Sequence, residues 1–166
     1  MYLQNTPGNS KPEFCKYNPI SRMERTGSYG WFELLEHPAD VGFRAYGDSL
    51  EEVFGNCAHA LISVILDPWN ISSSEHWKLE AEGSDLESLL VNWLNEVLFH
   101  VDTRRLVFDR FLISFTEPFR LLCQATGEAR TPARHPVRVS VKAVTYHQLR
   151  LFETEGRWIA EVFVDV

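Results

Sequence analysis

The sequence predicts an α+β fold in a single domain, with two helices packed on a mainly antiparallel β-sheet. Two periodicities predict it. Two segments repeat apolar side chains every three to four residues, as amphipathic helices do, and roughly seven or eight shorter segments alternate apolar with polar side chains, as strands do. The 166 residues, 45% of them hydrophobic, are enough for one sizeable core, and no internal repeat suggests a second domain.

The N-terminal part of the chain differs in composition from the rest. Residues 1–29 are rich in Asn, Pro, Gly, Ser and charged residues without a period, and we expect a flexible extension there. The folded domain is expected over residues 30–166. Its first two strands are expected at residues 31–35 and 41–46, separated by the short loop 36–40.

Both expected helices carry start and stop signals. The first begins at residues 47–49, where a capping-box spacing stands, and Asp-Pro at 67–68 ends it. The second begins at the capping-box spacing of residues 84–87 and ends at residues 102–103. Its apolar residues keep the i, i+3, i+4, i+7 spacing through four turns, which is typical of a helix with one face on a core.

The remaining alternating segments are expected to be strands. These segments are 77–81, 106–115, 119–128, 137–145, 147–153 and 158–164. Glu155 and Gly156 fit the turn of a hairpin between the last two. The loop 129–136 carries two Arg, two Pro and one His, and we expect it to be exposed.

Composition excludes several classes of function. The net charge is −7 and no basic run is present, so direct strong binding of nucleic acid is not expected. The three cysteines show no C-x-x-C pattern, which fits a reducing compartment and argues against a disulfide framework. Neither a signal peptide nor an apolar stretch long enough to span a membrane is visible, so we expect a cytoplasmic protein with no membrane contact.

The C-terminus concentrates negative charge. Asp165 stands next to the carboxylate of Val166, and a cation between them would relieve their repulsion. Hard cations such as Ca²⁺ and Mg²⁺ prefer carboxylate and carbonyl oxygens, and Asp40 would complete such a site if its loop lay beside the last strand. On the residues alone, a solvated strand end with unpaired charges is the commoner explanation.

Three further side chains are candidates for function. His37 precedes Asp40 in the same loop, where a backbone-bonded histidine is the ordinary interpretation and a ligand or pH-sensitive group the alternative. Lys142 is expected on a strand, either facing outward or balancing nearby carboxylates, and His147 could pair with an acid or serve a strand turn. No nucleophile, phosphate-loop or dinucleotide motif is present, so a hydrolase is unsupported.

Several motifs, taken together, resemble the archease family. The resemblance covers about residues 31–166, and its motifs follow one another in order and at suitable spacing. They are HPADVGFRAYG at 37–47, SLEEVF at 49–54, DLESLLVNWLNE at 85–96, VKAVTYH at 141–147 and the closing VDV at 164–166. One departure is visible, because the family usually has Thr where this chain has Pro38, and this puts the hydrogen bonding of the loop in doubt.

The resemblance implies an accessory protein and not an enzyme. Archeases assist the RtcB-type RNA ligase, a GTP- and Mn²⁺-dependent enzyme of tRNA splicing and RNA repair, by promoting its guanylylation and multiple turnover. A divalent-metal site, usually described with Ca²⁺, would be formed by Asp40, Asp165 and the main chain of Val166, with Mg²⁺ or Mn²⁺ as alternatives. Lys142 would belong to the same cluster. The other hypotheses are a chaperone-like modulator of RNA-modifying proteins and a metal-dependent hydrolase that uses the same acids with His147.

Overall fold

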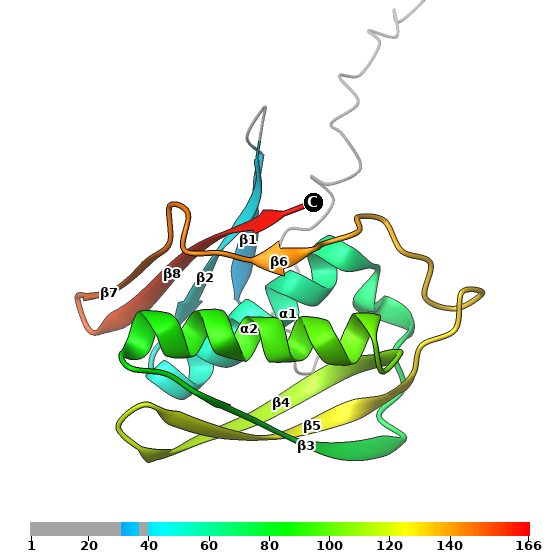
Figure 1. Ribbon diagram of the computed structural model, residues 1–166, viewed down its shortest axis with the longest axis horizontal. Coiled ribbons are helices and arrows are strands. Elements are labelled where there is room, and N and C mark those ends of the chain that lie inside the picture. The colour runs from blue at the N-terminus through cyan, green and yellow to red at the C-terminus, as the bar shows by residue number, and fades with distance from the viewer. Residues whose placement is uncertain (1–30, 37–39) are drawn as a thin grey trace, which may run out of the picture.

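The computed structural model describes residues 31–36 and 40–166, in which two helices lie between two β-sheets (Figure 1). Every strand pairing described is antiparallel. The α+β prediction is therefore confirmed, with the refinement that the strands divide into two sheets that cover the helices from opposite sides. The predicted extension at 1–29 lies outside the described residues, as does His37.

The elements, in chain order, are β1 Phe32–Glu36, β2 Val41–Gly47, α1 Leu50–Ile65, the 3-10 helix η3 Pro68–Asn70, β3 Glu75–Glu82, α2 Leu86–Asp102, β4 Leu106–Glu117, β5 Arg120–Ala129, β6 Ala143–Val144, β7 Arg150–Thr154 and β8 Arg157–Asp165. One sheet has the order β1-β2-β8-β6, with β7 also paired to β8, and the other has the order β3-β5-β4. Strand β8 is thus the centre of the first sheet, and the chain ends on it.

Local capping fixes where both helices begin. Ser49 caps α1 by accepting a hydrogen bond from the amide of Glu52, as the capping-box spacing predicts. The cap of α2 is Asp85, one residue beyond the predicted start, because its carboxylate accepts from the amide of Ser88 while the Ser88 hydroxyl accepts from the amide of Asp85. Neither α-helix that the structure describes is long and apolar enough to cross a membrane.

The core lies where the helices meet the sheets. Nearly all of α1 after its first turn is buried, which places this helix at the centre of the molecule. Trp93 of α2 is completely buried and donates from Nε1 to the carbonyl oxygen of Phe54 at 3.1 Å. Its ring meets Phe111 of β4 edge-on at 5.7 Å between centroids. Trp93 therefore connects both helices to the β3-β5-β4 sheet.

The segment between β5 and β7 differs from its prediction. The strand expected at 137–145 shrinks to β6, two residues long. Upstream of it, the amides of Arg138 and Val139 donate to the carbonyl oxygen of Ile65 at the end of α1. These two backbone amides are therefore hydrogen-bonded without belonging to a β-sheet. The preceding loop is mostly exposed as expected, except that His135 is buried and its Nε2 lies 3.2 Å from Oε1 of Glu128.

Candidate functional site

The register between β2 and β8 sets the position of the Asp40 loop. Val41 pairs with Val164, and every following residue of β2 pairs with the preceding residue of β8. One step beyond this first pair, Asp40 stands before Val41 and Asp165 stands after Val164. The two acids that the sequence singles out therefore occupy facing positions at the same end of neighbouring strands.

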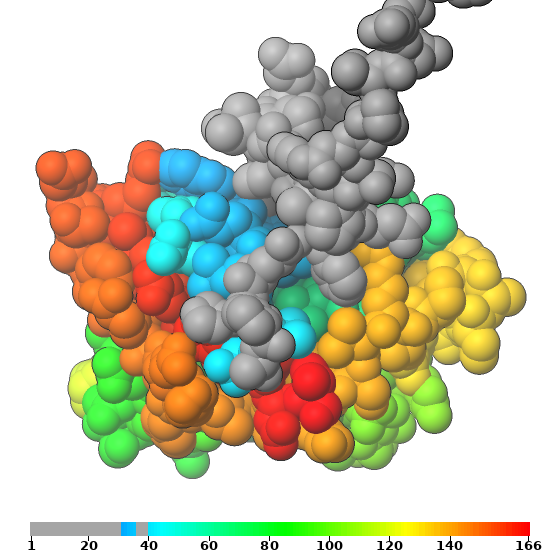
Figure 2. Space-filling view, turned by 90° about the horizontal axis from the view of Figure 1, so that it is seen from above, coloured from blue at the N-terminus to red at the C-terminus, as the bar shows by residue number. Residues whose placement is uncertain are grey.

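Strand β6 approaches the chain end from the other side. Ala143 pairs with Asp165, and the amide of Lys142 donates to the carbonyl oxygen of Asp165 at 2.7 Å. The side chain of Lys142 continues past this contact, and its Nζ donates to the main-chain oxygen of Val166 at 3.0 Å. Asp165 thus lies between the Asp40 strand and the Lys142 segment. Figure 2 shows the red C-terminal segment at the surface beside orange segments from between β5 and β8.

An asparagine on α2 holds β6 in this place. The side-chain amide of Asn95 donates to the carbonyl oxygen of Val144 at 2.9 Å, and its Oδ1 accepts from the amide of Val144 at 3.0 Å. Asn95 therefore takes the place that a further strand would occupy along β6. Sequence reasoning missed this residue. The pattern that could have predicted its role is a side-chain amide on an otherwise apolar helix face, four residues after Val91. Asn95 also donates to the carbonyl oxygen of Val91.

Strand alternation separates the charged edge from the core. Val164 and Val144 point inward and are 7% and 3% exposed. Side chains one residue away along a strand point to the opposite face, so Asp40 and Asp165 share the outer face of the sheet with Arg44. Arg44 is already engaged there, since its guanidinium contacts Glu33 at 2.9 Å and Glu161 at 2.8 Å. Its charge is therefore matched by its own two partners.

One of the predicted cluster residues, His147, is not brought into this arrangement. His37 falls outside the described residues. His147 is exposed, with its amide donating to Oγ1 of Thr145 at 3.3 Å and its Nε2 3.1 Å from the side-chain nitrogen of Gln148. Within the described ranges, no hydrogen bond or ion pair links His147 to Asp165 or Lys142. His147 lies five residues after Lys142 and beyond the direct contacts of the chain end.

The oxygen atoms at this edge suit a hard cation. The carboxylates of Asp40 and Asp165 and the main-chain oxygen of Val166 are the donor types that Ca²⁺ and Mg²⁺ prefer. Among the described residues, no group of three or more His, Cys, Asp or Glu side chains could hold a metal ion. A metal at this edge would therefore depend on the main-chain oxygen as a third ligand, and Lys142 contacts that same oxygen.

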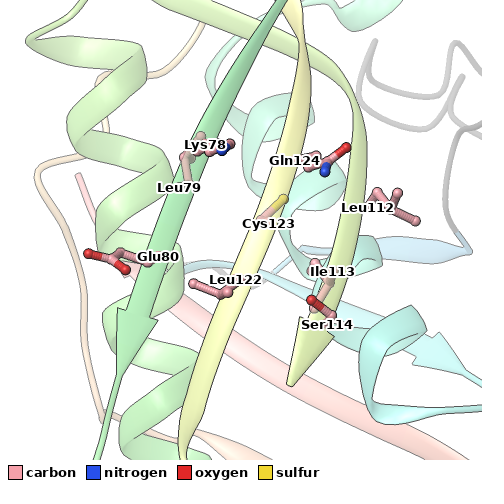
Figure 3. A pocket seen from close by; sticks show the side chains of 9 residues that line it. All are labelled: Lys78, Leu79, Glu80, Leu112, Ile113, Ser114, Leu122, Cys123 and Gln124. Atoms are coloured by element: carbon pink, nitrogen blue, oxygen red, sulfur yellow. The ribbon is translucent and has the colours of Figure 1, made fainter. Parts of the chain in front are cut away.

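A separate concave surface lies on the other sheet. A pocket of about 730 Å³ opens on β3-β5-β4, and Figure 3 shows the side chains that line it. Leu112 and Leu122 are 66% and 37% exposed, and Lys78, Glu80 and Gln124 lie around them. None of the residues of the C-terminal edge, which are Asp40, Lys142, Asp165 and Val166, lines this pocket. No motif in the sequence predicted a role for this surface.

Comparisons with known proteins give a consistent result. The model of the archease protein family (MTH1598/TM1083) matches residues 32–166. An archease of Methanosarcina mazei is 40% identical over 139 residues, covering 81% of this chain and 95% of its own. An archease of Pyrococcus abyssi is also 40% identical over 139 residues, with 81% and 98% covered.

Two solved structures have the same fold. The solution structure of Methanobacterium thermoautotrophicum protein 1598 superposes with a TM-score of 0.70 at 36% identity, covering 81% of this chain and 98% of its own. A crystal structure of an archease from Thermotoga maritima gives a TM-score of 0.54 at 19% identity, covering 80% and 94%. The second likeness supports the fold alone.

Proposed function

We propose that this chain, which belongs to the archease family, is a cytoplasmic activator of an RtcB-type RNA ligase and not itself an enzyme. It would promote guanylylation and multiple turnover of the ligase in tRNA splicing or RNA repair. The observation that carries the proposal is the meeting of three distant sequence motifs at one sheet edge. Strands β2, β8 and β6 bring together Asp40, Asp165 and Lys142.

A divalent cation belongs to this proposal. Asp40, Asp165 and the main-chain oxygen of Val166 would hold it, with Ca²⁺ as the first candidate and Mg²⁺ or Mn²⁺ as alternatives. Bound there, the cation would offset the repulsion between Asp40 and Asp165 and place a positive charge at the surface that contacts the ligase. Lys142 positions the chain end through its bond to Val166. His37 and His147 are the further residues that would take part in the contact with the ligase.

The acids can be tested in a ligation assay with a cognate ligase. We expect Asp40→Ala and Asp165→Ala each to lower the stimulation of ligation by at least about tenfold, because each removes a charged group that makes the contact. Glu153→Ala is the matched control, since Glu153 is an exposed acid on β7 of the same sheet. Full stimulation by both aspartate variants would overturn the proposal.

The chain end can be tested separately from the acids. Two glycines added after Val166 would turn its terminal carboxylate into a peptide carbonyl and move the negative charge of the chain end away from Lys142, whose Nζ donates to the Val166 oxygen at 3.0 Å. We expect weaker binding of Ca²⁺ by isothermal titration calorimetry and weaker stimulation of the ligase. Two glycines inserted in the exposed turn at Glu155 and Gly156 serve as the length control. Unchanged Ca²⁺ affinity in the extended chain would show that the terminal carboxylate charge of Val166 does not contribute to the binding.

A chaperone-like function is the second candidate. The Thermotoga maritima structure is described as that of a possible chaperone. In this chain, the exposed leucines Leu112 and Leu122 offer an apolar surface to a client. We expect Leu112→Glu to abolish any suppression of client aggregation, measured by light scattering, and to leave ligase stimulation unchanged. Asp40→Ala and Asp165→Ala should leave the suppression of aggregation unchanged and lower the stimulation of the ligase.

A further inference from the structure

A small pocket lies where the end of α2 meets the segment before β6. Its volume is about 160 Å³. One wall is apolar, formed by Ile65, Leu98, Val101, Val137, Val139 and Val141. The charged side chains that line it are Asp102, Arg105 and Arg130. The pocket thus combines a hydrophobic wall with two cationic groups and one anionic group.

The two arginines are held beside each other. The amide of Arg130 donates to the carbonyl oxygen of Arg105 at 2.6 Å, which joins the end of β5 to the residue before β4. Burial lowers the pKa of Arg130 and the charge of Arg105 lowers it further, whereas Asp102 acts in the opposite direction. The like charges therefore repel across the pocket, and Asp102 only partly offsets them.

Asp102 is the acidic neighbour of the pocket, but neither guanidinium forms an ion pair in the part of the chain that the structure describes. The ion pairs found there engage other arginines, such as Arg134 with Glu128 and Arg138 with Asp67. Arg105 is exposed and Arg130 is half-buried, so solvent screens part of their repulsion, and the remainder is an electrostatic cost that each charge imposes on the other. A bound anion would lower this cost.

The backbone of Arg105 is also unusual. Its φ is 56°, in the left-handed region that glycine and asparagine adopt far more readily than arginine. The position follows α2 closely, where glycine is common. The backbone of Arg105 is therefore strained in a way that a glycine at the same position would not be.

We propose that this pocket binds a phosphate group through Arg105 and Arg130. A guanidinium presents parallel N–H groups that match a phosphate, and a dianion would balance two arginines better than a single carboxylate does. The volume is below the roughly 300–1,000 Å³ of pockets that enclose drug-sized ligands, so it fits the phosphate itself and little beyond it. The pocket shares no residue with the C-terminal edge, and this proposal does not depend on the proposed contact with the ligase.

The proposal is tested by titrating the full chain with inorganic phosphate, using calorimetry and amide NMR shifts. Saturable binding is expected, with shifts confined to residues around the pocket. Arg105→Gln and Arg130→Gln should each weaken it by at least about tenfold, because each removes a charge and a bidentate donor. The matched control is Arg104→Gln, since Arg104 stacks over the ring of Phe99 at 5.6 Å and does not line the pocket.

A gain of affinity provides a check that misfolding cannot imitate. Asp102→Asn removes the one negative charge of the lining and should tighten phosphate binding by about two- to fivefold. Ribose 5-phosphate distinguishes the two sources of the ligand: tighter binding than inorganic phosphate would identify a phosphomonoester end, and equal binding a free phosphate.

Three results would overturn the proposal. They are the absence of saturable phosphate binding by the wild-type chain, an equal loss of binding in Arg104→Gln, and binding of acetate as tight as that of phosphate. The last result would mean that the arginines recognise a carboxylate and not a phosphate. Thermal unfolding of each variant confirms that the comparison is made on folded protein.

Discussion

His59 is a buried titratable residue in the middle of α1, where its ring meets Phe111 at 5.0 Å between centroids. Burial lowers its pKa from 6.5 to about 4. Between these values the unfolded chain binds a proton that the folded chain does not, so stability falls as the pH falls. We expect this group to remove up to about 3 kcal/mol of unfolding free energy between pH 7 and pH 4, measured by urea denaturation.

Other acid-sensitive groups are separated from His59 by comparing variants. His59→Leu should show a smaller loss of stability over the same pH range, even if its stability at pH 7 is lower. His147→Gln should retain the full loss, because His147 is exposed. A parallel pH dependence in wild type and His59→Leu would show that His59 does not titrate as its burial predicts.

Arg105 allows a prediction that separates stability from binding. Its φ of 56° disfavours any residue with a Cβ. Arg105→Gly should therefore raise the unfolding free energy by about 1 kcal/mol while phosphate binding is lost. Arg105→Ala is the control, since it also relieves the charge repulsion with Arg130 but keeps the Cβ, and it should therefore gain less stability than Arg105→Gly. Equal stabilisation by both would assign the effect to charge repulsion.

Strand β6 is held by α2 as well as by its own sheet. It is two residues long, and Asn95 satisfies both the amide and the carbonyl of Val144. Asn95→Leu would leave both groups without partners, and we expect a loss of about 2–4 kcal/mol. The amides of Val144 and Lys142 should lose protection from hydrogen exchange first, because their segment would detach from the sheet.

The same helix supplies a control for this effect. Asn92 also donates from its side chain to a carbonyl oxygen, that of Glu82, at 2.7 Å, but at an exposed site away from β6. Asn92→Leu should leave exchange at Lys142 unchanged. If Asn95→Leu did the same, β6 would be held by β8 alone, and Asn95 would have no role in positioning Lys142.

Elements whose signals are local could be predicted from the sequence. Both helices follow from apolar periodicity and from capping residues within four positions of each start. The shortening of the strand expected at 137–145 could not be predicted in this way, because the amides of Arg138 and Val139 find their partner in the distant residue Ile65. The side-by-side placement of Asp40 and Asp165 depends on the register of Val41 with Val164, which no local pattern encodes.

At the scale of the whole molecule, the two helices lie between the two sheets in the part of the chain that the structure describes (Figure 1). Trp93 occupies the centre of this arrangement, hydrogen-bonded to α1 and packed on β4. We expect Trp93→Phe to lower the unfolding free energy by about 2–3 kcal/mol, through the cavity and the lost hydrogen bond. Since both sheets pack on the same helices, the free energy of opening measured by native-state hydrogen exchange should fall by the same amount for the most protected amides of β5 and of β8.

Unequal losses would divide the molecule into two units. If only β5 lost protection in Trp93→Phe, the β3-β5-β4 sheet would open without disturbing the sheet that carries Asp165 and Lys142. Trp158→Phe is the control, because Trp158 is a partly exposed residue of β8 and removes little buried volume. Equal losses of protection in β5 and β8 would mean that the C-terminal edge unfolds together with the core. Variants of the core would then also weaken the proposed contact with the ligase.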